Sequence, residues 1–212
     1  FALPAGRYQA RVKVGKGIAP VEFEVKPEKA TELTVVVGVG KVRITAVPKP
    51  GAKPFTSTNY VGIFPLGPDG KPAKEQLTGN YGNPTEFTLP AGHYRTEVTV
   101  GKGVAHADFE VKPEEMTPIT VVVGVGTVRL TFVPKKGATP FPSTSYVSIY
   151  PLGPGGKPAE KQITGNYGNP VTFTLPAGRY RVSVKVRENW APSEIEVKTG
   201  EDRSIEIVVS RP

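Results

Sequence analysis

Short runs of alternating apolar and polar residues, most of them closed by a turn signal, follow one another along the whole chain. In residues 41–47, for example, Val42, Ile44 and Ala46 alternate with other side chains. A period of two is typical of a strand that buries one face. Similar runs predict strands at residues 60–64, 85–89, 94–100, 107–111 and 119–123, with a weaker polar edge strand at residues 72–78. Seven short strands without helical periodicity predict an all-β sandwich.

The run pattern is itself repeated. Phe1, Phe87 and Phe173 each open a segment with the pattern Phe-x-Leu-Pro-Ala-Gly-x-Tyr, so the spacing is 86 residues both times. Residues 39–124 and 125–210 align without a gap, with about 50 identities. Recent duplication is the simplest explanation.

The repeat defines the expected domains. Residues 39–124 and 125–212 are each predicted to be one sandwich, and residues 1–38 the C-terminal half of a preceding one. The chain has no initiator Met and opens inside a strand pattern, so we expect a fragment of a longer polypeptide. The half copy has two explanations: missing upstream sequence, or completion of the sandwich by a strand of another chain.

The junctions and the last copy carry further information. Residues 119–123 continue through Gly124-Val-Gly126 into the next strand without a linker, which predicts sandwiches arranged end to end in a semi-rigid rod. The last copy has Arg187-Glu-Asn-Trp190 where the middle copy has Gly101-Lys-Gly-Val104. Terminal copies of an array are often atypical, so we expect residues 125–212 to be the terminal one.

The segment Leu89-Pro-Ala-Gly-His-Tyr94 suggests a structural corner. Pro90 ends one strand, Gly92 permits an unusual backbone angle, and Tyr94 begins the next strand. A tyrosine just after such a corner often covers the edge of the core and donates its hydroxyl to the backbone. We therefore interpret this motif as structural.

This segment, with Phe109-Glu-Val-Lys112 and Ile119-Thr-Val-Val-Val123, resembles the prealbumin-like sandwich modules. These include carboxypeptidase regulatory-like domains, collagen-binding B-type repeats and units that accompany von Willebrand A domains. The resemblance implies an immunoglobulin-like fold, a bacterial exported or surface setting and a spacer or adhesive role, and it transfers no catalytic residue. Some B-type repeats carry a Lys–Asn isopeptide bond. Here Lys41 becomes Thr127 in the next copy, so we expect none.

Composition and charge narrow the function classes. The net charge of +8 invites a nucleic-acid partner, but basic residues alternate with acidic ones and no Lys/Arg block occurs, which favours a solvated surface. Cysteine is absent, and no apolar run is long enough to span a membrane.

The side chains that support catalysis or metal binding are sparse. His93 and His106 become Arg179 and Pro192 in the last copy. Glutamates recur at one strand position among basic residues, which favours exposed cross-strand pairs over a general acid; they are Glu24, Glu110 and Glu196. We expect no enzymatic activity, no cofactor and no metal ion.

The strongest candidate for binding is a seven-residue segment that is identical in two copies, residues 78–84 and 164–170. Its aromatic and amide side chains could contact a glycan or a protein surface; they are Asn80, Tyr81, Asn83, Asn166, Tyr167 and Asn169. Alternatively, Gly and Asn satisfy turn geometry, Tyr caps the core, and duplication explains the identity.

Two hypotheses for function follow. The first is a non-catalytic spacer in an extracellular, cell-surface or periplasmic protein, with other domains of the same chain or a neighbouring subunit as partners. The second is an adhesive module that uses the two identical segments.

Overall fold

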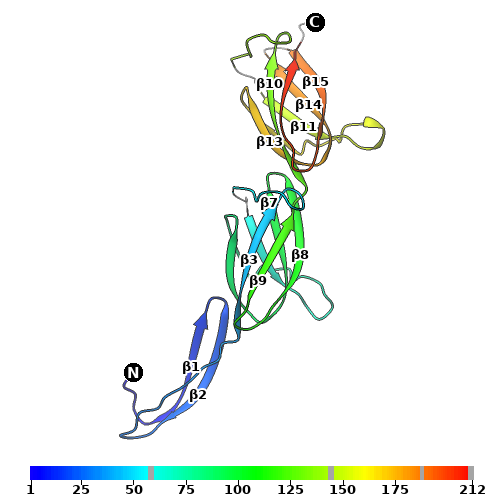
Figure 1. Ribbon diagram of the computed structural model, residues 1–212. Coiled ribbons are helices and arrows are strands. Elements are labelled where there is room, and N and C mark those ends of the chain that lie inside the picture. Colours follow the sequence, from blue (N-terminus) through cyan, green and yellow to red (C-terminus); the bar gives the residue numbers. More distant parts are fainter. Residues whose placement is uncertain (57–59, 143–145, 187–188, 210–212) are drawn as a thin grey trace. The chain divides into compact units, whose positions relative to one another are not determined.

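The computed structural model of the chain describes residues 1–56, 60–142, 146–186 and 189–209. Strands joined by turns make up nearly all of it, with one short 3₁₀ helix, η1 (Pro154–Gly156) (Figure 1). This confirms the predicted all-β class. Of the altered turn and tail of the last copy, residues 187–188 and 210–212 lie outside the described residues.

The strands follow the 86-residue repeat. The first hairpin is β1 (Gly6–Val14) and β2 (Gly17–Val25). The middle copy holds β3 (Val39–Val47), β4 (Tyr60–Pro65), β5 (Thr78–Asn80), β6 (Thr85–Pro90), β7 (Gly92–Val100), β8 (Gly103–Val111) and β9 (Met116–Val122). The last copy holds β10 (Val125–Val133), β11 (Tyr146–Pro151), β12 (Thr164–Asn166), β13 (Val171–Pro176), β14 (Gly178–Val186), β15 (Asn189–Val197) and β16 (Asp202–Val208).

The last copy contains two sheets with different strand orders. One sheet has the order β13-β10-β16 and the other β12-β11-β14-β15. Within the first sheet, β10 pairs antiparallel with β13 and parallel with β16. The middle copy repeats both orders, as β6-β3-β9 and β5-β4-β7-β8. Copies that share most of their sequence therefore share their strand order.

The core of the last copy is formed by the alternate residues that the sequence pattern picks out. On β10, Val128, Leu130 and Phe132 are fully buried while Arg129 between them is exposed. Inward residues of β11, β13, β14, β15 and β16 belong to the same cluster. Because both sheets contribute, the two layers bury one shared apolar core, whose burial drives folding without any disulfide.

One predicted strand is wrong. Residues 72–78 do not form an edge strand; Pro72 makes a single bridge to Leu66, and the strand begins only at Thr78. The segment returns to β4 through separate hydrogen bonds, from Ala73 N–H to Pro65 O and from Leu77 N–H to Ile63 O, both 2.8 Å long. Polar residues between these two contacts leave the chain in an irregular path, so the regular pairing is delayed to Thr78–Asn80.

The contacts divide the chain into two compact units that cut across the repeat. One unit contains Phe1–Thr45, Val61–Glu97 and His106–Thr120, and the other Ala46–Tyr60, Val98–Ala105 and Val121–Pro212. The sandwich boundaries at residues 38/39 and 124/125 therefore remain a sequence prediction, and each unit includes parts of two copies.

Candidate binding surface

The identical segment of the last copy, residues 164–170, begins on an edge strand and continues into a turn. Its first three residues form β12, which pairs antiparallel with β11 from Val147↔Asn166 to Ile149↔Thr164. The middle copy has the same pairing, from Val61↔Asn80 to Ile63↔Thr78. The first half of the segment is therefore strand, and only its second half is a loop.

Asn169 points inward. Its Oδ1 accepts a hydrogen bond from Phe132 N–H at 2.9 Å, and its Nδ2 donates to Phe132 O at 2.9 Å and to Phe141 O at 2.8 Å. The amide thus ties β10 to the segment that follows it. Asn83 occupies the same position in the middle copy and is likewise half-buried. Because its hydrogen-bonding groups serve the fold, we leave Asn169 out of the candidate surface.

Tyr167 remains 69% exposed, and Tyr81 of the middle copy 70%. The Tyr167 ring stands edge-on to the ring of Tyr146 on β11, with centroids 4.9 Å apart and planes inclined by 66°. Such an edge-to-face pair is an attractive arrangement of two aromatic rings. The contact holds the Tyr167 ring in place and leaves most of its surface to solvent.

The residues around this ring pair fix its geometry. Gly165 of β12 lies under the Tyr146 ring, because a Cβ atom there would overlap the ring atoms. Gln162 Nε2 donates to the Tyr146 hydroxyl at 3.2 Å. Asn166 Oδ1 accepts from Tyr167 N–H at 2.9 Å, as Asn80 Oδ1 does from Tyr81 N–H. The candidate surface is therefore Tyr146, Gln162, Asn166 and Tyr167.

Sequence reasoning missed two members of this surface, Tyr146 and Gln162. A signal was available, because both are repeated 86 residues apart, as Tyr60 and Gln76. Each lies outside the seven identical residues, so only pairing across the sheet brings it to the segment.

The polar faces of the hairpins carry cross-strand ion pairs. In the middle copy Arg95 contacts Asp108 through two hydrogen bonds of 2.6 and 2.8 Å. The hydrogen bond from Arg95 lowers the pKa of the Asp108 carboxyl and raises that of the guanidinium. In the last copy Arg179 and Arg181 both contact Glu194, at 3.1 and 3.5 Å. These pairs are exposed, so they contribute little to the stability of the fold and mainly set the charge pattern of the surface.

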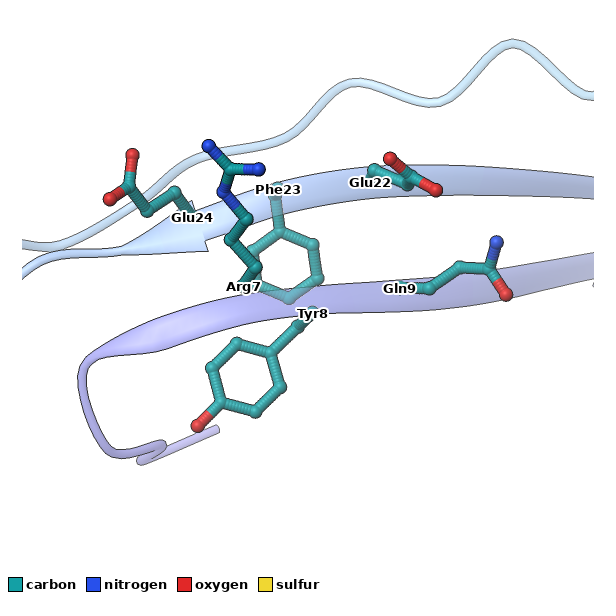
Figure 2. Close-up of a pocket in the computed structure, with 6 residues that line it drawn as sticks. All are labelled: Arg7, Tyr8, Gln9, Glu22, Phe23 and Glu24. Carbon is teal, nitrogen blue, oxygen red and sulfur yellow. The ribbon is translucent and has the colours of Figure 1, made fainter.

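In the first hairpin, consecutive residues of both strands border a shallow hollow of about 440 Å³ (Figure 2). Arg7 lies opposite Glu24, and Gln9 opposite Glu22. The rings of Tyr8 and Phe23 stack at 5.8 Å between centroids. No residue of the candidate segments borders this hollow, whose polar lining repeats the cross-strand pattern of the other copies.

The Leu-Pro-Ala-Gly-x-Tyr corner is structural, as predicted. The hydroxyl groups of Tyr8, Tyr94 and Tyr180 donate to the carbonyl oxygens of the prolines four residues earlier, at 2.8, 2.9 and 2.8 Å. Burial raises the pKa of Tyr94 and Tyr180. These tyrosines fix the entry into β7 and β14.

One histidine meets a single carboxylate. His106 Nε2 lies 3.1 Å from Glu97 Oε2 on an exposed face. Among the described residues, no three His, Asp or Glu side chains are placed to hold a metal ion. In the same part of the chain, no helix has the length and hydrophobicity needed to cross a lipid bilayer.

No family model matches the chain, and no curated protein matches it in sequence. Its fold is similar to several solved structures. The Bacillus anthracis TIE protein is 18% identical with a TM-score of 0.33, over 99% of this chain and 43% of that one. A streptococcal ancillary pilin is 14% identical with a TM-score of 0.40, over 99% and 76%. The minor pilin of Streptococcus agalactiae is 13% identical with a TM-score of 0.37, over 82% and 98%. The chain thus spans less than half the length of the first of these proteins, and what it shares with all three is a similarity of fold.

Proposed function

We propose that the chain is a non-catalytic spacer region of an exported or cell-surface protein, in which each sandwich adds length and carries tension. One observation supports this role above the others. In the last copy the first and last strands, β10 and β16, pair in parallel from Thr127↔Asp202 to Val133↔Val208. Because the two strands run in the same direction, the chain enters at one end of the sandwich and leaves at the other.

The same pairing suits a load-bearing part. Tension applied through the two strands acts along them, so the inter-strand hydrogen bonds are loaded together rather than opened one by one. The paired stretch of seven residues is about 23 Å long. β10 is also the central strand of its sheet, held by β13 on its other side. The exported setting rests on the resemblance of the sequence to prealbumin-like modules.

Single-molecule pulling on the full chain tests this role. We expect each complete copy to unfold in one step and to release about 280–310 Å of extended chain, less its folded length. Arg203→Pro on β16 should lower the unfolding force, because proline removes a backbone donor from the loaded pairing. Thr127 N–H donates to Glu201 O and Val209 N–H to Val133 O, so the odd-numbered backbone groups of β16 face β10. Ser204→Pro on the same strand is the matched control, because the Ser204 N–H points away from β10 and its loss leaves the loaded pairing intact. Equal losses of force in the two variants would argue against the load-bearing role.

An adhesive role is the second candidate, and the Tyr167–Tyr146 pair favours it. Leaving an aromatic ring exposed forgoes the free energy of its burial, and here a second ring and two hydrogen bonds hold that exposed ring in position. A flat apolar face beside the Asn166 and Gln162 amides suits a saccharide ring, which offers C–H groups on one face and hydroxyls at its edge. We propose glycans as the ligand class.

A glycan array with the full chain and the double variant Tyr81→Ala/Tyr167→Ala tests the adhesive role. Binding by the parent chain and not by this variant would support it. The variant Tyr81→Phe/Tyr167→Phe keeps both rings, so it should retain binding if ring stacking carries the affinity. Equal signals from the parent chain and the alanine variant would exclude this surface.

A further inference from the structure

The turn between β7 and β8 contacts a strand of the next copy. Lys102 N–H in this turn donates to Thr174 O on β13 at 3.0 Å. The turn between β1 and β2 makes the equivalent contact, from Lys16 N–H to Thr88 O on β6 at 3.2 Å. Each contact lies inside one compact unit, so each unit joins the turn of one copy to the body of the next. We name residues 14–17 and 100–103 the joint turns.

The first glycine of each joint turn faces the threonine of the next copy. Gly15 and Gly101 have φ angles of +57° and +58°, which disfavour other residues. A Cβ atom on either would also overlap backbone and side-chain atoms of Thr88 or Thr174. The backbone angle and the neighbouring copy therefore both require glycine here.

The second glycine is required by the neighbour alone. Gly103 is buried, and its φ lies outside the left-handed range. A Cβ atom on it would overlap Cγ1 of Val125, the first residue of β10, and would approach Cγ1 of Val123 to 3.2 Å. Gly17 stands in the same relation to Val39, and a Cβ atom on it would approach Val37 Cγ1 to 3.1 Å. Close contact between copies thus accounts for this glycine, whereas the local backbone does not.

The N-terminal end of the next copy, which receives the joint turn, is held in place by the Leu-Pro-Ala-Gly-x-Tyr corner. Ala91 N–H donates to Gly38 O at 2.8 Å, and Ala177 N–H to Gly124 O at 3.0 Å. Val125 is fully buried at the same site. The receiving surface therefore consists of the connecting glycine, the first valine of the copy and its threonine, and it occurs twice with the same bonds.

We propose that each joint turn is a recognition element whose partner is the N-terminal end of another copy of this repeat. The last copy carries Arg187 and Asn189 at the positions of Gly101 and Gly103. In the joint turns that the structure describes, a Cβ atom at either glycine position would overlap the receiving threonine or valine, so the surface fits a turn with glycine at both positions. The joint turns thereby decide which copies accept a following copy. This inference concerns how copies recognise one another and stands apart from the load they carry.

A double-mutant cycle between Gly103 and Val125 in the full chain tests the proposal, with hydrogen exchange of the Lys102 amide as the readout. Gly103→Ala should speed this exchange about tenfold, because the new methyl group pushes the turn away and weakens the Lys102–Thr174 bond. Val125→Ala removes the obstructing Cγ1 atom. The double variant Gly103→Ala/Val125→Ala should return the exchange rate to within about threefold of the parent chain.

Two outcomes would overturn the proposal. An unchanged Lys102 exchange rate in Gly103→Ala would show that the copies do not fit closely at this point. Fast exchange that Val125→Ala does not reverse would place the cause inside the hairpin. Gly153→Ala is the matched control, because a Cβ atom at Gly153 would lie 3.7 Å from Lys157 O, which is an ordinary contact distance. In this variant the Lys102 amide should exchange as slowly as in the parent chain.

Discussion

Asn169 and Phe132 exchange two hydrogen bonds, each 2.9 Å long, between the side-chain amide and both backbone groups of a strand residue. A third bond joins the amide to Phe141 O. Asn169→Ala would leave these half-buried backbone groups without their partner, so we expect a loss of about 3 kcal/mol in the free energy of unfolding. Denaturant unfolding measures it. Asn166→Ala, in the same segment but exposed, is the control and should cost less than about 1 kcal/mol.

This prediction distinguishes a structural asparagine, Asn169, from a surface asparagine, Asn166, which the sequence alone does not distinguish. Asn166 and Asn169 lie in an identical segment, and nothing in the local pattern tells the outward amide from the inward one. A loss of stability in Asn166→Ala as large as that in Asn169→Ala would contradict the assignment of Asn166 to the surface.

The corner tyrosines predict a loss of stability at alkaline pH. Burial raises the pKa of Tyr180 and Tyr94 above that of an unfolded tyrosine. The folded state therefore holds its protons where the unfolded state has begun to lose them. This contribution to stability is complete below the unfolded pKa, near 10.0, and is lost as the pH rises through the folded value. Unfolding free energies measured from pH 8 to 11 should fall more steeply in the parent chain than in Tyr94→Phe/Tyr180→Phe.

The same variant tests the hydrogen bond itself. At neutral pH each Tyr→Phe substitution removes a bond to a proline carbonyl, of 2.9 Å at Tyr94 and 2.8 Å at Tyr180, and should cost about 1 kcal/mol. Tyr167→Phe serves as the control, because its exposed hydroxyl supports no part of the core. An alkaline slope that is the same in the parent chain and the double variant would show that these tyrosines do not carry the effect.

The corner and the strands were accessible from sequence because both depend on local signals. Pro90 and its equivalent Pro176 are the last residues of β6 and β13. The alternation at Val128, Leu130 and Phe132 matches their burial. Residues 72–78 misled the prediction, since Pro72 offers only one bridge and regular pairing waits for Thr78. Strand propensity alone does not determine where pairing with a neighbour starts.

Contacts between residues that are far apart in the sequence were harder to predict than the corner and the strands. The Tyr146–Tyr167 ring pair and the Lys102–Thr174 bond each depend on how strands are ordered and on which copy follows. Gly103 was visible as a repeated glycine, but its reason, the proximity of Val125, lies in another copy. A single sequence shows such positions only as repeated residues without an assigned cause.

The Arg95–Asp108 pair predicts a loss of stability as the pH falls, whereas the corner tyrosines predict a loss as the pH rises. The hydrogen bond from Arg95 lowers the Asp108 pKa, so the stabilising contribution is present above the unfolded pKa and is lost as the pH falls through the folded value. NMR titration of the Asp108 carboxyl should give a pKa below the usual range. Arg95→Met should return it toward the ordinary value, and Arg181→Met in the last copy should leave it unchanged. A carboxyl that titrates identically in the parent chain and in Arg95→Met would contradict the pairing in solution.

The two complete copies differ at several core positions, and the largest change in side-chain size is between Ala46 and Phe132. Phe132 is fully buried on β10, and the matching residue of the middle copy is Ala46, which is also buried. Phe132→Ala should cost about 3–5 kcal/mol, because it removes a large apolar side chain and leaves a cavity. Hydrogen exchange resolved by strand can assign the loss: amides of β10–β16 should exchange much faster in the variant, while those of β4 and β5 should keep their rates.

We further expect the middle copy of the parent chain to exchange faster than the last copy, because it buries less apolar surface at this position. Slower exchange in the middle copy would show that other packing compensates for Ala46, and the difference in core volume would then not set the order of unfolding.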